Sequence, residues 1–449
     1  MMDRLTAVLA ALALAYPTLA AREFSFRGNT PIASQASSGH ALSSNVLTLK
    51  KSGRAARSSA YLTSLRAGGA SASKPYSYGA EPVDNLFSEE YIAEIEFDGV
   101  SFQVIVDSGS SDTWLVQEGF TCVDYYGDLQ SEADCYFGPT FNGTFDEGSI
   151  SDENFNIEYG DGEFLTGALG YENVTLAGIT VKQEVALVNY SYWSGDDVTS
   201  GLVGLAYPLL TSAYAGTNAS EDSTQIEYDP IITTLIKDEL IEPVFSLALE
   251  RNSDSGYLAL GGLPPVNHTG DFASTPILMI EIYDEPEMAT QYSFYTIIAD
   301  AYIYEGSENT KADTGDWGKL FPDAVVNTTQ FPIIVDSGTT LLYLPTELYE
   351  DIAALYDPPA VYIDDEGASF APCNATVPEV GVQIGGTAFW ISEADLLMQD
   401  VVDPDTGYCL IGPQDGTTGP YILGDTFLNN VVSVFDVGAS EIRFAANNY

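Results

Sequence analysis

The stretch Ile105-Val-Asp-Ser-Gly-Ser-Ser111 returns 229 residues later as the near copy Ile334-Val-Asp-Ser-Gly-Thr-Thr340. Each copy places one aspartate, Asp107 or Asp336, between an apolar run typical of a buried strand and a Ser-Gly turn. A glycine-centred apolar block follows each copy, with Asp-to-Gly separations of 97 and 88 residues, at Gly201-Leu-Val-Gly-Leu-Ala206 and Tyr421-Ile-Leu-Gly-Asp425. One such run alone would be typical of a turn. Two runs with matched blocks instead indicate a duplicated lobe that carries a pair of functional aspartates.

The formal charge of the chain is −50 at pH 7, and it is unevenly distributed. Residues 1–74 hold nine of the fifteen Lys and Arg residues but only Asp3 and Glu23 as acids, so this segment carries +7 and the rest −57. Such an acidic surface disfavours nucleic acid and anionic membranes as partners. Crowded carboxylates repel one another when ionised, so we expect their pKa values to be raised on average. The sequence therefore predicts a protein that is stable in acid and loses structure toward neutral or alkaline pH.

The N-terminal end has the pattern of an export signal. Residues 5–15 form an apolar run that follows Arg4 and leads into Thr18-Leu-Ala20, which predicts a signal peptide over residues 1–20. The run is too short to span a bilayer, and no later segment is long and apolar enough to do so. The end at Asn-Asn-Tyr449 offers no lipid-anchor signal. We therefore expect a secreted, extracellular protein without a membrane anchor, with vacuolar delivery less favoured.

The rest of the chain is typical of an all-β protein. It is rich in Tyr, Phe, Val, Ile and Thr, with frequent Gly, Asn and Asp turns and few helical periodic runs. Segments 91–97 and 441–444 alternate like half-buried strands. Short helices are expected near 228–238 and 345–356, with Thr346 as the N-cap of the second.

Elimination leaves carboxylates as the reactive groups. The chain has only two histidines, His40 and His268. This small number disfavours a Ser-His-Asp triad and a His-based zinc site, which both need histidine. Four cysteines in an exported chain suggest two disulfides, which argues against a thiol nucleophile. Two aspartates held close cannot both ionise readily, so one keeps a proton while the other can activate water. We therefore expect hydrolysis by Asp107 and Asp336 as one titrating unit, with no metal and no cofactor.

Several sequence motifs, in the order in which they occur along the chain, resemble those of one protein family. They are Asp107-Ser-Gly-Ser-Ser-Asp-Thr-Trp114, Ile157-Glu-Tyr-Gly-Asp-Gly162, Gly201-Leu-Val-Gly-Leu-Ala-Tyr-Pro208, Ile422-Leu-Gly-Asp-Thr-Phe427 and Val434-Phe-Asp436. From about residue 80 to its end, the chain resembles the pepsin-like aspartic endopeptidases, particularly the secreted fungal ones. The resemblance implies a bilobal fold with the active cleft between two similar β-rich lobes. Pro264-Pro265 favours a boundary near 265–275, so we expect the N-terminal lobe, with Asp107 and a flap, at 75–268 and the C-terminal lobe, with Asp336, at 269–449. The resemblance also implies polypeptide substrates and a monomer.

The resemblance assigns roles to the residues around the aspartates. Gly109 and Gly338 allow tight turns and donate N–H groups to the carboxylates. Ser108 and Ser337 cross-link the two loops beneath the pair, where many relatives have threonine. Ser110 and Thr339 hydrogen-bond the outer carboxylate oxygens. The plainer interpretation is that all four hydroxyl side chains are turn residues.

The resemblance also implies a flap and an apolar pocket. Tyr159 at the hairpin tip closes over substrate, Gly160 and Gly162 supply mobility, and Trp114 supports Tyr159. The pocket beside the cut bond is lined by Ile105, Tyr159 and Leu202, which implies a preference for large hydrophobic residues. Asp161 is the position at which an aspartate in fungal relatives lets the pocket also accept lysine.

The four cysteines allow three disulfide connectivities. The family arrangement implies Cys122–Cys135 and Cys373–Cys409, which gives each lobe one bridge. Seven Asn-x-Ser/Thr sequences fit a glycosylated surface, at Asn142, Asn173, Asn189, Asn218, Asn267, Asn327 and Asn374.

The basic segment 21–74 has two interpretations. It could be a disordered basic arm. Because it follows a signal peptide and precedes a domain of this family, we favour a cationic propeptide that inhibits the enzyme until acid weakens the attraction, with the mature start between 70 and 85. Lys50 and Lys51 are both candidates to contact the aspartate pair.

Two alternative functions stay open. One is a processing protease of yapsin type that cuts at basic sites, which the acidic surface permits and no anchor signal supports. The other is a non-catalytic pepsin-fold binding or inhibitor protein. Such a protein would usually lack an aspartate or the flap tyrosine, whereas Asp107, Asp336 and Tyr159 are all present.

Overall fold

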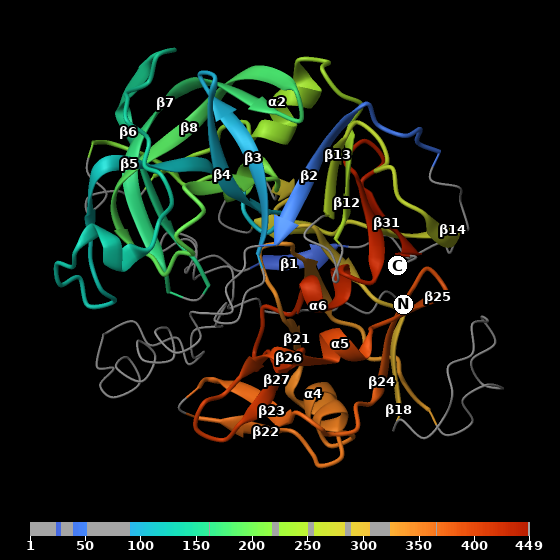
Figure 1. Cartoon of the computed structure of the whole chain (residues 1–449). Helices are drawn as coiled ribbons and strands as arrows, with labels where there is room; N and C mark the ends of the chain where they lie inside the picture. The colour runs from blue at the N-terminus through green and yellow to red at the C-terminus, as the bar shows by residue number, and fades with distance from the viewer. Residues whose placement is uncertain are drawn as a thin grey trace.

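A computed structural model describes residues 24–27, 39–51, 90–160, 162–217, 224–249, 256–282, 289–305, 324–364 and 366–447. The predicted signal peptide, residues 1–20, lies outside these ranges. Strands dominate and form two lobes, so the expected all-β, bilobal pepsin-like fold is confirmed (Figure 1). In the part of the chain that the structure describes, no helix has the length and apolar character needed to cross a membrane.

The N-terminal lobe is built on long antiparallel strands. The hairpin of β3 and β4 turns through Gly99, whose φ of +77° favours glycine. The strands of this lobe are β3 (Tyr91–Phe97), β4 (Val100–Asp107), β5 (Thr113–Cys122), β6 (Ser149–Glu158), β7 (Phe164–Leu176), β8 (Ile179–Tyr192), β9 (Gly201–Gly204), β10 (Ala213–Ala215) and β11 (Gln225–Ile226), and its helix is α2 (Ile231–Lys237). The observed β3 matches the predicted strand at both ends, because its alternating side chains face a core on one side.

One sheet of 15 strands connects the two lobes. Its order is β11-β10-β6-β7-β8-β5-β9-β4-β3-β2-β13-β12-β30-β31-β14. Its remaining members are β2 (Asn45–Lys51), β12 (Val244–Ala248), β13 (Gly256–Leu260), β14 (His268–Pro276), β30 (Val431–Asp436) and β31 (Glu441–Asn447). The C-terminal strand β31 thus pairs with β14, the segment in which the sequence places the end of the first lobe.

The C-terminal lobe carries smaller sheets and short helices. Its further strands are β15 (Met279–Ile282), β16 (Ala289–Gln291), β17 (Thr296–Ile298), β18 (Ala301–Glu305), β19 (Val325–Asn327), β20 (Pro332–Val335), β21 (Leu342–Leu344), β22 (Val361–Ile363), β23 (Ala368–Pro372), β24 (Glu379–Ile384), β25 (Thr387–Trp390), β26 (Leu397–Val402), β27 (Tyr408–Ile411), β28 (Pro413–Asp415) and β29 (Ile422–Leu423). Its helices are α4 (Thr346–Ala353), α5 (Glu393–Leu396) and α6 (Asp425–Leu428).

Both predicted helices exist, as α2 and α4, but the predicted N-cap of α4 is wrong. The N-cap is Pro345, and no side chain caps the helix there. Thr346 is already helical, and its hydroxyl donates to Asp415 Oδ1 at 2.8 Å. A tertiary hydrogen bond therefore occupies the side chain that the local sequence would use as a cap.

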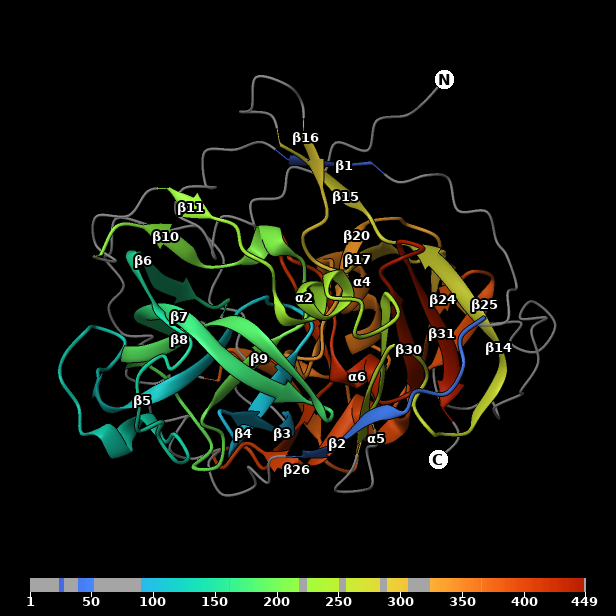
Figure 2. The same cartoon turned by 90° about the horizontal axis from the view of Figure 1, so that it is seen from above.

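Two strands come from the basic segment that precedes the first lobe. β1 (Phe24–Arg27) pairs antiparallel with β15, and Figure 2 shows these two strands at one edge of the molecule. β2 lies between β3 and β13 in the large sheet and buries Leu49 completely. Lys51 extends over the Tyr91 ring, with Nζ 5.6 Å from the ring centroid. The described strands of this segment, β1 and β2, are therefore paired with strands of the folded body.

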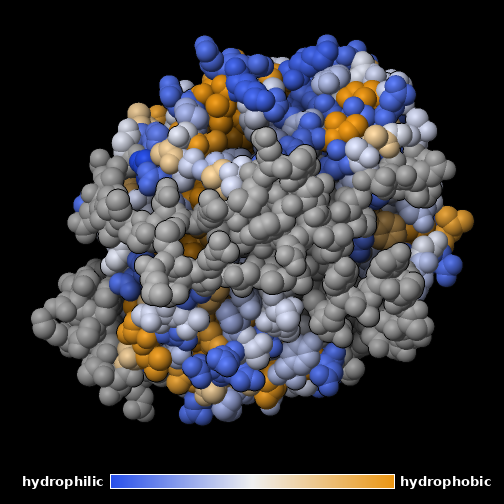
Figure 3. Space-filling view, turned by 180° about the vertical axis from the view of Figure 1, so that it is seen from behind, coloured by the Kyte–Doolittle hydropathy of each residue, from blue (hydrophilic) through white to orange (hydrophobic). Residues whose placement is uncertain are grey.

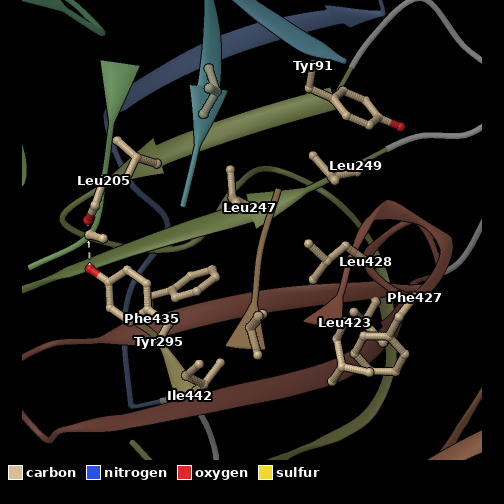
Figure 4. Close-up of a cluster of buried hydrophobic side chains, with 14 of the residues drawn as sticks. Tyr91, Leu205, Leu247, Leu249, Tyr295, Leu423, Phe427, Leu428, Phe435 and Ile442 are labelled. Carbon is tan, nitrogen blue, oxygen red and sulfur yellow. Dashed lines mark hydrogen bonds between the residues drawn. The ribbon is translucent and has the colours of Figure 1, made fainter. Parts of the chain in front are cut away.

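The core continues from one lobe into the other. Figure 4 shows Leu205 and Leu247 of the N-terminal half beside Tyr295, Phe435 and Ile442 of the C-terminal half. The Tyr295 hydroxyl donates to the Leu205 carbonyl at 2.8 Å, and the Phe245 and Phe435 rings stack at 4.5 Å. Because this shared core fixes the lobes against each other, the two aspartate loops can meet at their junction.

Candidate active site

The two aspartates occupy equivalent positions in the two lobes. Asp107 is the last residue of β4 and pairs in parallel register with Gly204 of β9. Asp336 directly follows β20, whose Val335 pairs in parallel register with Leu423 of β29. The glycine-centred blocks noted in the sequence are therefore the strands that lie beside each aspartate. The repeated pattern corresponds to one local structure built twice.

The two loops face each other closely. A Cβ added at Gly109 would lie 2.5 Å from the Asp336 carboxylate, and one at Gly338 would lie 2.5 Å from Asp107 Oδ1. Only glycine leaves room for the carboxylate of the opposite lobe at these positions. Each glycine also donates its backbone N–H to the aspartate of its own loop, at 2.6 Å for Gly109 and 2.8 Å for Gly338.

Ser108 and Ser337 connect the loops by four hydrogen bonds. Each backbone N–H donates to the other residue's hydroxyl, at 3.1 Å for Ser108 and 2.9 Å for Ser337. The Ser108 hydroxyl donates to the Val335 carbonyl at 3.1 Å, and the Ser337 hydroxyl donates to the Val106 carbonyl at 2.9 Å. Both side chains are buried. This symmetric cross-link holds the two carboxylates together from below.

The outer oxygens of the carboxylates accept hydrogen bonds from hydroxyl groups. Ser110 donates to Asp107 Oδ2, and Thr339 donates to Asp336 Oδ2 at 2.7 Å. Burial, followed by the neighbouring Asp336 carboxylate, raises the pKa of Asp107 well above its usual range. Under acidic conditions this pair can therefore hold one proton between its two members.

The hairpin of β6 and β7 brings Tyr159 toward the aspartates. Trp114 Nε1 donates to the Tyr159 hydroxyl at 2.9 Å, which is the contact that the resemblance implied. Burial and then the Asp107 charge raise the pKa of Tyr159 well above its usual range, so its hydroxyl stays protonated. Gly160 is exposed, and Gly162 has a φ of +88° that favours glycine. Asp161 lies outside the described residues.

An apolar cluster lies beside the pair. Ile105, Trp114 and Leu202 are buried together, and Tyr159 packs against them. The cluster also contains two aromatic residues that the sequence analysis missed. Trp193 lies edge-on to Trp114 at 5.3 Å and to Tyr159 at 5.8 Å, and Phe137 stacks on Trp193. No local sequence motif indicates that these two residues belong to the cluster. Strand pairing and the nearby disulfide bring them to it from distant parts of the chain.

Asp112 is a further buried carboxylate that the sequence analysis did not single out. Its oxygens accept hydrogen bonds from Ser212 N, at 2.9 and 3.1 Å, and from the Tyr228 hydroxyl at 2.6 Å. Burial raises the pKa of Asp112 to about 6. The available signal was a second acid, five residues after Asp107, within the same run of small residues.

The two predicted disulfides are present, and the predicted glycan sites differ in their exposure. The disulfides are Cys122–Cys135 and Cys373–Cys409, the pairing that the resemblance implied. Of the predicted glycan sites, Asn142, Asn189, Asn267 and Asn374 are exposed and Asn173 and Asn327 are half-buried, whereas Asn218 lies outside the described residues. Asn173 donates to Glu147 Oε1 at 2.8 Å and to Asp98 Oδ1 at 3.2 Å.

Comparison with known proteins identifies the family. Residues 90–447 match the family described as eukaryotic aspartyl protease, and the chain belongs to that family. The fold and family together define its class as a pepsin-like aspartic endopeptidase.

Named relatives come from fungi and from animals. A probable aspartic-type endopeptidase of Aspergillus fumigatus is 41% identical over 368 residues, which cover 80% of this chain and 78% of the relative. Gastricsin of Cavia porcellus is 28% identical, covering 77% of this chain and 76% of gastricsin. An acid protease of Saccharomycopsis fibuligera is 26% identical, covering 79% of this chain and 80% of that protease.

Proposed function

We propose that this chain is a secreted acid endopeptidase, made as a zymogen, in which Asp107 and Asp336 activate water. The ionised member of the pair takes a proton from a bound water, whose oxygen attacks the carbonyl carbon of the peptide bond. The protonated member donates to the carbonyl oxygen. On collapse of the tetrahedral intermediate, the aspartate that took the water proton donates it to the leaving nitrogen, and the other aspartate recovers its proton from the hydroxyl formed at the carbonyl oxygen. The C–N bond breaks, and a carboxylic acid and an amine are released.

The close approach of the two loops supports this function, because Gly109 and Gly338 each leave room for the carboxylate of the opposite lobe. A Cβ at either Gly109 or Gly338 would lie 2.5 Å from that carboxylate. A pair held so closely favours sharing one proton, and the hydroxyl groups of Ser110 and Thr339 support the remaining charge.

We further propose that the apolar cluster of Ile105, Leu202 and Tyr159 selects a large hydrophobic residue beside the cut bond. The mobile lid of this pocket is the Tyr159 hairpin, with Trp114 as its support. Asp161 is the position proposed to admit lysine as a second choice. The substrates are polypeptides, and the enzyme acts as a monomer outside the cell, with glycans on its exposed asparagines.

For the segments, we propose a signal peptide at 1–20, a propeptide at 21–74, an N-terminal lobe at 75–268 and a C-terminal lobe at 269–449. The pairing of β2 with β3 and β13 supports a propeptide that stays bound to the acidic body. Acid protonates carboxylates, weakens the attraction for this basic segment and permits its removal.

The test is cleavage of a denatured protein by the full-length chain after incubation at acidic pH, with and without pepstatin. The expected result is cleavage in acid that pepstatin abolishes, mainly beside large hydrophobic residues. Cleavage confined to basic sites would instead support the yapsin-type alternative. Absence of cleavage after the propeptide has been removed would contradict the proposal and favour a binding or inhibitor protein.

A further inference from the structure

The loop closed by the Cys122–Cys135 disulfide lies against the flap hairpin. The two cysteines are 13 residues apart in sequence. Val123 N donates to the Ser191 carbonyl at 2.9 Å, and Gln130 N donates to the Cys122 carbonyl at 2.9 Å. The first of these bonds anchors the loop to the end of β8, and the second closes the loop on itself. β8 pairs along its length with β7, the return strand of the flap.

Within this loop, Tyr125 reaches the turn of the flap. A Cβ built on Gly162 would lie 3.5 Å from Cε2 of Tyr125, which is ordinary van der Waals contact. The Tyr125 ring also lies 5.9 Å from the Tyr192 ring, which lies 5.8 Å from Phe164 at the start of β7. A series of aromatic contacts therefore runs from the disulfide loop to the strand residue that directly follows the flap turn.

Gly162 is part of the same closed turn as Tyr159. Gly162 N donates to the Tyr159 carbonyl at 2.9 Å, and Tyr159 N donates to the Glu163 carbonyl at 2.7 Å. Glu163 Oε1 in turn accepts a hydrogen bond from Ser194 N at 2.7 Å. Because these bonds make the turn one unit, a contact that restrains Gly162 also restrains Tyr159.

We propose that Tyr125 is a positioning residue that holds the flap turn over the aspartate pair, because its ring lies beside Gly162 and packs against Tyr192. The proposal rests on the proposed function, since flap position matters to catalysis only if Asp107 and Asp336 cleave peptides. Tyr125 is 37% exposed, so its removal uncovers little of the core. The contact therefore affects the flap more than the stability of the fold.

The test compares three variants of the full chain, processed in acid. Tyr125→Ala removes the ring, Tyr125→Phe keeps the ring beside Gly162, and Leu129→Ala changes a residue of the same loop that is 78% exposed. For each, kcat and KM on a peptide with a large hydrophobic residue, the Tm, and hydrogen exchange of the 157–165 segment are measured.

Tyr125→Ala is expected to lower kcat/KM by roughly threefold to tenfold, mainly through a higher KM, and to speed exchange at the flap turn. Tyr125→Phe and Leu129→Ala are expected to stay within about twofold of the native chain. A lower Tm with unchanged kcat/KM and flap exchange would overturn the proposal, because the role would be structural. A Phe variant as impaired as the Ala variant would also overturn it. If the native chain cleaves nothing, the proposed function fails, while flap exchange still tests the contact.

Discussion

Ser337 lies beneath the two carboxylates, where its hydroxyl donates to the Val106 carbonyl and accepts from Ser108 N. Ser337→Ala removes both bonds and leaves two buried backbone groups without that partner. We expect the free energy of unfolding to fall by about 1–3 kcal/mol, because unpaired buried polar groups keep their desolvation cost. Chemical denaturation measures the loss, and peptide cleavage should fall with it because two of the four hydrogen bonds that connect the loops are lost.

Ser433→Ala is the matched control for this prediction. Ser433 is equally buried, but its hydroxyl has no hydrogen-bond partner among the residues that the structure describes. Its removal is therefore expected to be close to neutral. Equal losses in the two variants would contradict the assigned role of the cross-link.

At the residue scale, local patterns predicted the positions of Asp107, Asp336 and Tyr159, because each lies in a short motif with its own turn chemistry. Trp193 and Tyr125 could not be predicted in this way. Their neighbours are more than 30 residues away in sequence or belong to the disulfide loop, and only the folded chain brings the rings together.

At the element scale, alternation predicted β3 to the residue, because Tyr91, Ala93, Ile95 and Phe97 lie buried on one face while Glu94 and Glu96 lie on the other. The pairing of strands could not be predicted. β2 joins β13 across about 200 residues, and β12 joins β30 across a similar separation. Such pairings depend on the shape of the whole core, which local periodicity does not encode.

Leu49 of β2 tests whether the basic segment leaves the body on maturation. Leu49 is 0% exposed, so Leu49→Ala should destabilise the full-length chain by about 2–5 kcal/mol. Leu42→Ala, at a residue that is 68% exposed, is the control and should have little effect. After cleavage between 70 and 85 and removal of the released segment, thermal melts of all three proteins should coincide. A difference that persists would mean that β2 stays bound in the mature protein.

At the scale of the whole molecule, the chain carries a charge of −50, and the coloured part of the face in Figure 3 shows hydrophilic areas with hydrophobic patches between them. Some carboxyl groups are nevertheless buried. Burial raises the pKa of Glu172 to about 8, of Glu184 to about 7 and of Asp112 to about 6. Their ordinary values are 4.5 for Glu and 3.8 for Asp, so the folded state holds protons that the unfolded chain has released.

The sign of the pH dependence follows from these shifts. At pH values well below the ordinary 3.8 and 4.5, both states are protonated and these groups cost no stability. Stability then falls as pH rises from these ordinary values to the raised values of about 6 to 8, because the unfolded chain releases protons that the folded state still holds. We expect a lower Tm at pH 8 than at pH 5, and a smaller decrease in Glu172→Gln. Glu118→Gln, at an exposed position, should retain the native decrease; a Tm that does not change between the two pH values would contradict this.

The central claim is that one carboxylate from each lobe acts in a single proton-sharing pair. Asp336→Asn tests it most directly, measured as cleavage of a denatured protein at acidic pH by the processed chain. We predict a loss of at least about a thousandfold in kcat/KM, as expected when one member of a catalytic unit is removed, with an unchanged circular dichroism spectrum. Full activity in this variant, with the fold intact, would contradict the account.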